Sequence, residues 1–308
     1  MTSHAPAIVG RVEPTAVRHV RRVHATGISH VAKLELPTDD ADAAKFVREA
    51  VRAHPEVYFA RHAIFGEGPS EEIVIPRIAE AHGISIDRSF VAIVPIGGRH
   101  IQHFWRLVDQ LGIPHTTLLD LDLGRSTGDD LQIKAAAKAL QGSSRVLPEQ
   151  DAKNVATALT NTRPALPEGG KLDATFFANW SAAFEGQGIF MSGPLDLDML
   201  MLSAFPNAYK KLPAGATGPQ NANDADRQEA AGKRVLGEGG FGLAAYADLP
   251  QRTLFPWYAY LFLGVRGKPA VHLAALGELD DLDIELACPP VLYRLIKHVE
   301  TSLETPLA

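Results

Sequence analysis

Acidic side chains occur in close pairs at three points along the chain, and each pair follows a short apolar run. The apolar runs end at Gly66, Leu119 and Ser192. If these runs are strands of one parallel sheet, their carboxyl ends share an edge, which is where open α/β sheets bind their ligands. The acidic pairs are Glu67 with Glu71, Asp120 with Asp122, and Asp196 with Asp198.

Six carboxylates gathered at one edge would repel one another strongly unless cations lay between them. Oxygen donors suit Mg²⁺ or Mn²⁺ better than Zn²⁺, particularly because the chain has one cysteine and no clear histidine cluster. The spacing therefore predicts a divalent metal site.

Each acidic residue also has a purely structural interpretation. Carboxylates that follow strands often cap helices or lie near helix N-termini, and this interpretation is favoured for Glu71 or Asp198 taken alone. Glu67 is flanked by glycines on both sides, which allow a tight backbone turn. In the segment 120–122, strand alternation predicts that both aspartates point to one face while Leu121 enters the core.

The elements that must position these residues alternate in type. Apolar runs predict strands, and amphipathic stretches with helical spacing predict helices between them. Short connections between buried strands imply right-handed crossovers and a parallel sheet. We expect strands at 63–66, 90–96, 114–119 and 188–192, and helices at 71–82, 100–111, 131–140, 147–158 and 172–184.

The two ends of the chain are less regular. Residues 1–38 carry no clear start of a domain, although an alternating strand is predicted within them. The segment from 211 to 226 is polar and rich in Gly, Pro and Asn, which predicts a loop. We expect a strand at 28–36, followed by a helix that ends at about residue 53. Further helices are expected at 199–211, with a break at Pro206, at 268–279 and at 290–303. A connector is expected at 162–170, and a buried strand or helix at 257–265.

Composition excludes several classes of protein. The hydrophobic content of 46% is ordinary for a globular chain. No apolar run approaches the roughly 18 residues of a membrane span, and the N-terminus lacks a signal-peptide pattern. The single cysteine, Cys288, excludes a disulfide framework and a multi-cysteine zinc site. We therefore expect a cytoplasmic protein with no membrane partner.

The formal net charge of −6 opposes long-range attraction to nucleic acid. Buried metal-binding carboxylates would contribute to this count while facing cations. Local basic patches can also oppose the average, and the first segment is locally basic, although such residues often form only a solvated face. The basic residues there are Arg11, Arg18, Arg21, Arg22 and Lys33.

Two motifs make the sequence recognisable. The segment 67–71 reads Glu-Gly-Pro-Ser-Glu, and about fifty residues later 120–124 reads Asp-Leu-Asp-Leu-Gly. Together they resemble the Toprim domain of topoisomerases, primases, recombination proteins and nucleases of the OLD (overcoming lysogenisation defect) family. The form of the first motif, the segment 73–76 (IVIP), the glycines 97–98 and the segment 54–60 (HPEVYFA) are most similar to the OLD family.

This resemblance covers about residues 30–308 and implies a set of roles. It implies a two-metal site with Mg²⁺ or Mn²⁺ and a catalytic lysine. The position just beyond the second acidic motif adds two candidate phosphate contacts. Lys268 could equally be an ordinary lysine at the start of a helix. The implied metal ligands are Glu67, Glu71, Asp120, Asp122, Asp196 and Asp198, the catalytic lysine is Lys268, and the possible DNA contacts are Arg125 and Ser126.

The implied fold is an α/β Toprim-type parallel sheet flanked by helices, with an inserted helical subdomain. We expect an N-terminal lead-in at 1–60, the first part of the Toprim core at 61–140, and an inserted helical segment at 141–186. The core continues at 187–205, a loop and helical insertion follows at 206–252, and a C-terminal Toprim part with the lysine and a closing helix occupies 253–308.

The implied function is a metal-dependent DNA endonuclease that nicks or cleaves duplex DNA with little sequence preference. In full-length members of the family an N-terminal ATPase precedes this region, and no GxxxxGK[ST] motif is present here. We therefore expect the ATPase to be absent from this chain, and a homodimer in the full-length protein. The alternative is a non-catalytic Toprim module that binds nucleic acid or mediates recombination. A topoisomerase tyrosine motif and a primase zinc module are not evident.

Overall fold

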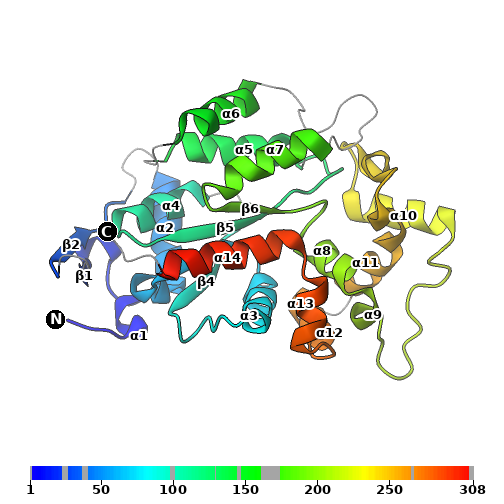
Figure 1. Cartoon of the computed structure of the whole chain (residues 1–308), viewed down its shortest axis with the longest axis horizontal. Helices are drawn as coiled ribbons and strands as arrows, with labels where there is room; N and C mark the ends of the chain where they lie inside the picture. The colour runs from blue at the N-terminus through cyan, green and yellow to red at the C-terminus, as the bar shows by residue number, and fades with distance from the viewer. Residues whose placement is uncertain are drawn as a thin grey trace.

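A four-stranded parallel sheet forms the centre of the molecule, with the strand order β4-β3-β5-β6 (Figure 1). The computed structural model describes residues 2–22, 27–36, 41–97, 101–128, 130–143, 147–160, 174–264 and 267–304. The strands are β3 (His62–Gly66), β4 (Val91–Pro95), β5 (His115–Asp120) and β6 (Ile189–Ser192). Every residue of β3 and β6 is buried, as expected for parallel strands covered on both faces. The predicted α/β fold with a parallel sheet is confirmed.

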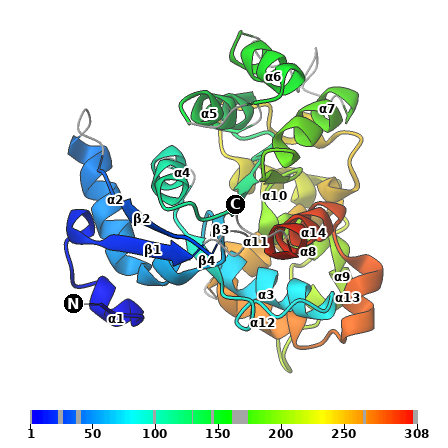
Figure 2. The same ribbon diagram turned by 60° about the vertical axis from the view of Figure 1, so that its left-hand side comes forward.

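Helices cover both faces of this sheet, as the turned view shows (Figure 2). On one face lies α4 (Ile101–Gln110), where the indole N–H of Trp105 donates to Thr117 Oγ1 on β5 at 2.9 Å. On the other face lie α3 (Glu71–Ala81) and α14 (Pro290–Glu304). There His62 of β3 hydrogen-bonds Ser302 of α14 at 3.0 Å.

The remaining helices form two groups. One group, α5 to α7, follows β5 and leads into β6, and the other, α8 to α13, gathers beyond the carboxyl ends of the strands (Figure 1). The bounds are α1 (Pro6–Val9), η1 (Pro14–Ala16), α2 (Ala41–Ala53), η2 (Pro55–Phe59), α5 (Asp130–Gln141), α6 (Glu149–Thr160), α7 (Ala174–Glu185), α8 (Leu197–Ala204), α9 (Pro206–Tyr209), α10 (Ala225–Leu236), η4 (Gly242–Tyr246), η5 (Pro250–Leu254), α11 (Phe255–Phe262), α12 (Lys268–Leu276) and α13 (Asp281–Ala287).

Several elements were not predicted at their observed bounds, among them β1 (Arg18–Arg22), α10 and α13. Strand β1 pairs antiparallel with β2 (Ser29–Lys33), and it escapes prediction because RHVRR contains a single apolar residue. Helix α10 begins directly after Asp224, whose side chain accepts from two backbone N–H groups of the first turn. Helix α13 begins with a capping box at Asp280. The predicted connector 162–170 and Gly98 lie outside the described residues.

The apolar segment around Trp257 forms helix α11, which resolves the open choice between strand and helix. Among the described helices, none combines the length and the apolar character that crossing a bilayer requires.

Candidate active site

Glu67 lies in the turn that joins β3 to α3, and Glu71 shapes that turn. The carboxylate of Glu71 accepts from the backbone N–H of Glu67 at 2.9 Å and from that of Gly68 at 3.1 Å. A Cβ at Gly66 would lie 2.6 Å from Cγ of Glu71, so the glycine leaves room for this side chain to fold back. Glu71 is therefore both a predicted metal ligand and the group that closes the turn.

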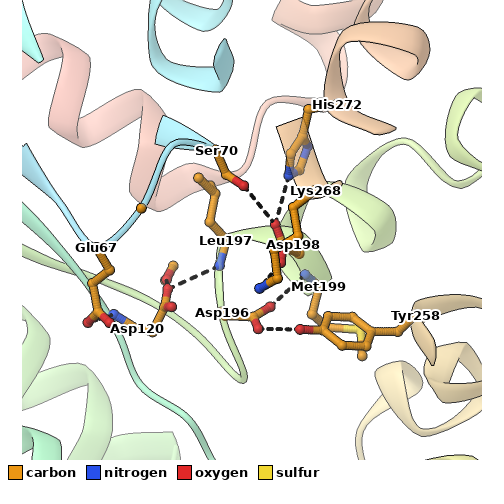
Figure 3. A network of polar contacts seen from close by, with 12 residues as sticks. Glu67, Ser70, Asp120, Asp196, Leu197, Asp198, Met199, Tyr258, Lys268 and His272 are labelled. Atoms are coloured by element: carbon orange, nitrogen blue, oxygen red, sulfur yellow. Dashed lines mark hydrogen bonds and ion pairs between the residues drawn. The ribbon is translucent and has the colours of Figure 1, made fainter. Parts of the chain in front are cut away.

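Asp120 joins three strands at their carboxyl ends. Its backbone N–H donates to Oε1 of Glu67 at 2.9 Å, which links β5 to the turn after β3. Its Oδ1 accepts from Ser192 Oγ of β6 at 2.6 Å and from the backbone N–H of Leu197 at 3.2 Å. Figure 3 shows Glu67 and Asp120 next to each other at this edge. The sheet thus brings the first two predicted acidic groups together.

Asp122 does not belong to the strand, so the prediction that strand alternation directs its carboxylate is wrong. Strand β5 ends at Asp120, and Asp122 has a positive φ of 54°, whereas Leu121 is buried as predicted. Arg125 pairs with the carboxylate of Asp122, and Gly128 lies against its carbonyl. A tight turn, and not strand alternation, directs this carboxylate.

Asp196 caps α8, and two further side chains contact it. Its Oδ1 accepts from the backbone N–H of Met199 at 2.9 Å, and its Oδ2 accepts from the hydroxyl of Tyr258 at 2.5 Å (Figure 3). Arg125 lies 3.7 Å from the same Oδ2. Arg125 therefore bridges Asp122 and Asp196, whereas Ser126 is exposed.

Asp198 is as buried as Asp196 and is surrounded by hydrogen-bond donors. Nζ of Lys268 lies 2.5 Å from Oδ2, while His272 Nε2 and Ser70 Oγ lie 2.8 and 3.2 Å from Oδ1 (Figure 3). The structure thus brings the predicted Lys268 to the acidic edge. Sequence reasoning missed Ser70, Tyr258 and His272; the i, i+4 spacing of Lys268 and His272 on one helix was the available signal.

Burial and mutual repulsion raise the pKa of most of these carboxyl groups. Burial, with repulsion from Asp122 and Glu71, raises the pKa of Glu67 to about 7 despite the hydrogen bond from Asp120. Burial and the charge of Glu67 likewise raise the pKa of Asp120 well above its usual range. Burial and the charge of Asp198 raise the pKa of Asp196 to about 6.

The pKa of Asp198 is shifted in the opposite direction. Burial alone would raise its pKa, but the hydrogen bond from His272 and the charge of Lys268 outweigh burial and lower it. The acidic edge therefore has one part whose charge Lys268 and His272 compensate. Its other part, Glu67 and Asp120, has no cationic side chain paired to it within the described ranges.

The donor set fits a hard divalent cation by chemistry and by charge. Carboxylate oxygens are the ligands that Mg²⁺ and Mn²⁺ prefer, and a cation would relieve the repulsion that raises these pKa values. In the part of the chain that the structure describes, however, no three Asp, Glu, His or Cys side chains are already arranged around one point. Several of the carboxylates are instead hydrogen-bonded to the protein itself.

A cavity of about 1030 Å³ opens from this edge. Its lining includes Glu67 and Asp122 at the acidic edge, Arg106 of α4 and Lys138 of α5. Both of these basic side chains belong to exposed residues. The cavity therefore connects the acidic edge with positive charge at the surface.

Comparison with known proteins gives two kinds of result. The chain is similar to the C-terminal region of the Burkholderia pseudomallei OLD protein, with 21% identity, a TM-score of 0.47 and coverage of 80% of this chain and 99% of that one. It is also similar to the C-terminal region of the Xanthomonas campestris pv. campestris OLD protein, with 18% identity, a TM-score of 0.45 and coverage of 80% of this chain and 97% of that one. No match was found among curated proteins.

The second result concerns the core of the site. A family model described as overcoming lysogenization defect protein-like, Toprim domain, matches residues 58–122, which contain Glu67, Glu71, Asp120 and Asp122. Residues 58–122 of the chain therefore form an OLD-like Toprim domain.

Proposed function

We propose that this chain is a Mg²⁺- or Mn²⁺-dependent DNA endonuclease module that hydrolyses phosphodiesters in duplex DNA. One observation carries the proposal: Glu67 and Asp120 lie together at the carboxyl edge of the sheet, and burial and mutual repulsion raise both of their pKa values. Perturbed carboxyl groups in a cleft are typical of functional sites. The OLD-like Toprim domain supports the same conclusion.

The proposed ligands are the six acidic residues of the edge. Two bound divalent ions would activate a water molecule and stabilise the leaving 3′ oxygen. The ligands are Glu67, Glu71, Asp120, Asp122, Asp196 and Asp198.

The basic residues have separate roles in this proposal. Lys268 is 45% exposed and its Nζ lies at Asp198, so it can contact a phosphate at the acidic edge and stabilise negative charge that develops there. Arg125 bridges Asp122 and Asp196, so it holds the acidic residues in place in addition to any phosphate contact. Ser126 is a further candidate for a phosphate contact.

DNA would reach the site along the cavity lined by α4 and α5. Arg106 and Lys138 supply positive charge in its lining, which offsets the repulsion expected from a chain with a net charge of −6. Contacts of this kind are made to phosphates and carry no sequence information, so we expect weak sequence preference.

The direct test is incubation of supercoiled plasmid with the protein and Mn²⁺. We expect the wild type to produce nicked and then linear DNA, and Asp120→Ala, purified in parallel, to produce neither. Equal nicking by both proteins would contradict the proposal, because it would indicate a contaminating nuclease. Binding of DNA without nicking under Mg²⁺ or Mn²⁺ would support the non-catalytic Toprim alternative.

Several expectations remain predictions: an ATPase domain joined to this region in the full-length protein, a homodimer of that protein, and a cytoplasmic location. The domain boundaries expected from the sequence also remain proposals.

A further inference from the structure

Behind Asp198 lies a buried chain of hydrogen bonds that the proposed chemistry does not use directly. The hydroxyl of Tyr209 lies 2.5 Å from Nδ1 of His272, and Nε2 of the same ring lies 2.8 Å from Oδ1 of Asp198. Exposure is 2% for Tyr209, 0% for His272 and 2% for Asp198. The ring of Phe262 packs against His272 with centroids 5.4 Å apart. The imidazole is therefore enclosed, and both of its nitrogens have assigned partners.

The chemistry of these partners determines which nitrogen carries the proton. Asp198 is paired with Lys268, and an ionised carboxylate can only accept hydrogen bonds, so Nε2 of His272 must be the donor. In the neutral ring Nδ1 then accepts, and the hydroxyl of Tyr209 donates to it. Tyr209 thus selects the ring form that can hold Asp198.

The same helix also supplies the partner of the second oxygen. His272 and Lys268 lie four residues apart on α12, so one helical turn presents both of them to Asp198. His272 contacts Oδ1 and Lys268 contacts Oδ2. Without His272, Oδ1 would keep only the longer contact from Ser70 at 3.2 Å, so the carboxylate could rotate and Lys268 would lose its fixed partner.

We propose that His272, supported by Tyr209, is a positioning residue that fixes the orientation of Asp198 and, through it, the position of Lys268 at the acidic edge. This role rests on the proposed nuclease function, which supplies the task for Lys268. A fully buried histidine among aromatic rings is unfavourable unless its polar atoms are satisfied. Here the two hydrogen bonds satisfy both ring nitrogens, and one of them is made to Asp198 of the candidate site.

The test compares two replacements of the same side chain. His272→Gln retains an N–H donor that can reach Asp198, whereas His272→Leu fills the space without a donor. Loss of a partner that orients a metal-site residue typically costs about 10- to 100-fold in activity or metal affinity. We expect His272→Leu to lower kcat for plasmid nicking by about that factor, with KM for DNA nearly unchanged, and His272→Gln to restore most of it.

A merely structural role would give a different pattern, because both replacements would then act only on the melting temperature. Wild-type kcat in folded His272→Leu, or an equal loss in His272→Gln, would overturn the proposal. If His272→Leu does not fold, Tyr209→Phe replaces it, and we expect a smaller loss of kcat. Tyr58→Phe is the matched control, since the buried hydroxyl of Tyr58 has no hydrogen-bond partner among the described residues. If Tyr209→Phe, like this control, has the kcat of the wild type, the proposal is overturned.

Two measurements do not depend on cleavage. In protein labelled with ¹⁵N-histidine, NMR should show the His272 ring protonated at Nε2 with Nδ1 accepting, and a neutral ring protonated at Nδ1 would overturn the proposal. Calorimetric titration with Mn²⁺ should show weaker binding by His272→Leu than by His272→Gln, and equal affinities would overturn it. A wild type that binds Mn²⁺ but nicks no DNA would contradict the proposed function alone, and these two measurements would still decide the role of His272.

Discussion

Replacing Glu67 by glutamine tests the electrostatics of the acidic edge without deleting the side chain. The amide oxygen of glutamine can still accept from the backbone N–H of Asp120, whose bond to Glu67 measures 2.9 Å. The replacement therefore removes a buried negative charge and preserves the hydrogen bond that joins β3 to β5. Its effect on stability should depend on pH, because the carboxyl group of Glu67 binds a proton more tightly in the folded chain.

The sign and size of this effect follow from the raised pKa. The Glu67 carboxyl has a pKa of 4.5 when unperturbed and about 7 in the folded chain, which corresponds to roughly 3 kcal/mol of destabilisation once it is ionised in both states. This cost is absent below pH 4.5, grows between pH 4.5 and 7, and is complete above pH 7. At pH 8 without metal, Glu67→Gln should therefore melt roughly 5 °C higher than the wild type.

The assay is thermal unfolding followed by circular dichroism in EDTA at several pH values between 5 and 8. Glu72→Gln is the matched control, because Glu72 is exposed on α3, the helix that follows the turn of Glu67, and its replacement should change little. With Mn²⁺ added at pH 8, the wild type should gain stability and Glu67→Gln should gain less, since one ligand is lost. A Glu67→Gln protein that is less stable than the wild type in EDTA at pH 8, or equally shifted at pH 5 and pH 8, would refute the reasoning.

Three further predictions concern the same site. Mn²⁺ affinity should be higher at pH 8 than at pH 6, because bound carboxylates must be deprotonated and those of Glu67 and Asp120 have raised pKa values; calorimetry showing no pH dependence would contradict this. Gly128→Ala should displace Asp122, since the added Cβ would lie 1.8 Å from its carbonyl oxygen, so nicking should be lost and the melting temperature lowered; Gly186→Ala, whose Cβ would have ordinary contacts at 3.6 Å, is the control. Lys268→Gln should lower kcat by about 10²- to 10³-fold and leave Mn²⁺ affinity close to that of the wild type, whereas a similar loss of metal affinity would show that the lysine acts only by holding the ligands.

Much of the fold could be predicted because its strands are short apolar runs. Strands β3, β4 and β6 lie where continuous apolar residues occur, and short connections imply their parallel arrangement. Strand β1 could not be found in this way, because four of its five residues are basic or histidine and its pairing with β2 defines it. Helix α10 was missed because a polar segment precedes it and only its cap marks the start.

Part of the candidate site could also be predicted from the sequence, and part could not. The carboxyl ends of neighbouring parallel strands must share an edge, so the clustering of Glu67, Asp120 and Asp196 follows from where each strand ends. The turn that directs Asp122 depends on the close approach of Gly128, which spacing alone does not reveal.

By itself, the sequence determined which acidic residues reach the edge of the sheet, because strand ends and chain order are local properties. Only the tertiary structure decided which of them carry compensated charge. Asp198 meets Ser70 and His272, which lie 128 and 74 residues away in the chain, and it pairs with Lys268. Asp120 instead lies against Glu67, and among the described residues no cationic side chain forms an ion pair with it. Such partners are brought together by the packing of α3, α8 and α12. The difference between a lowered and a raised pKa at the same edge is therefore a property of the folded molecule.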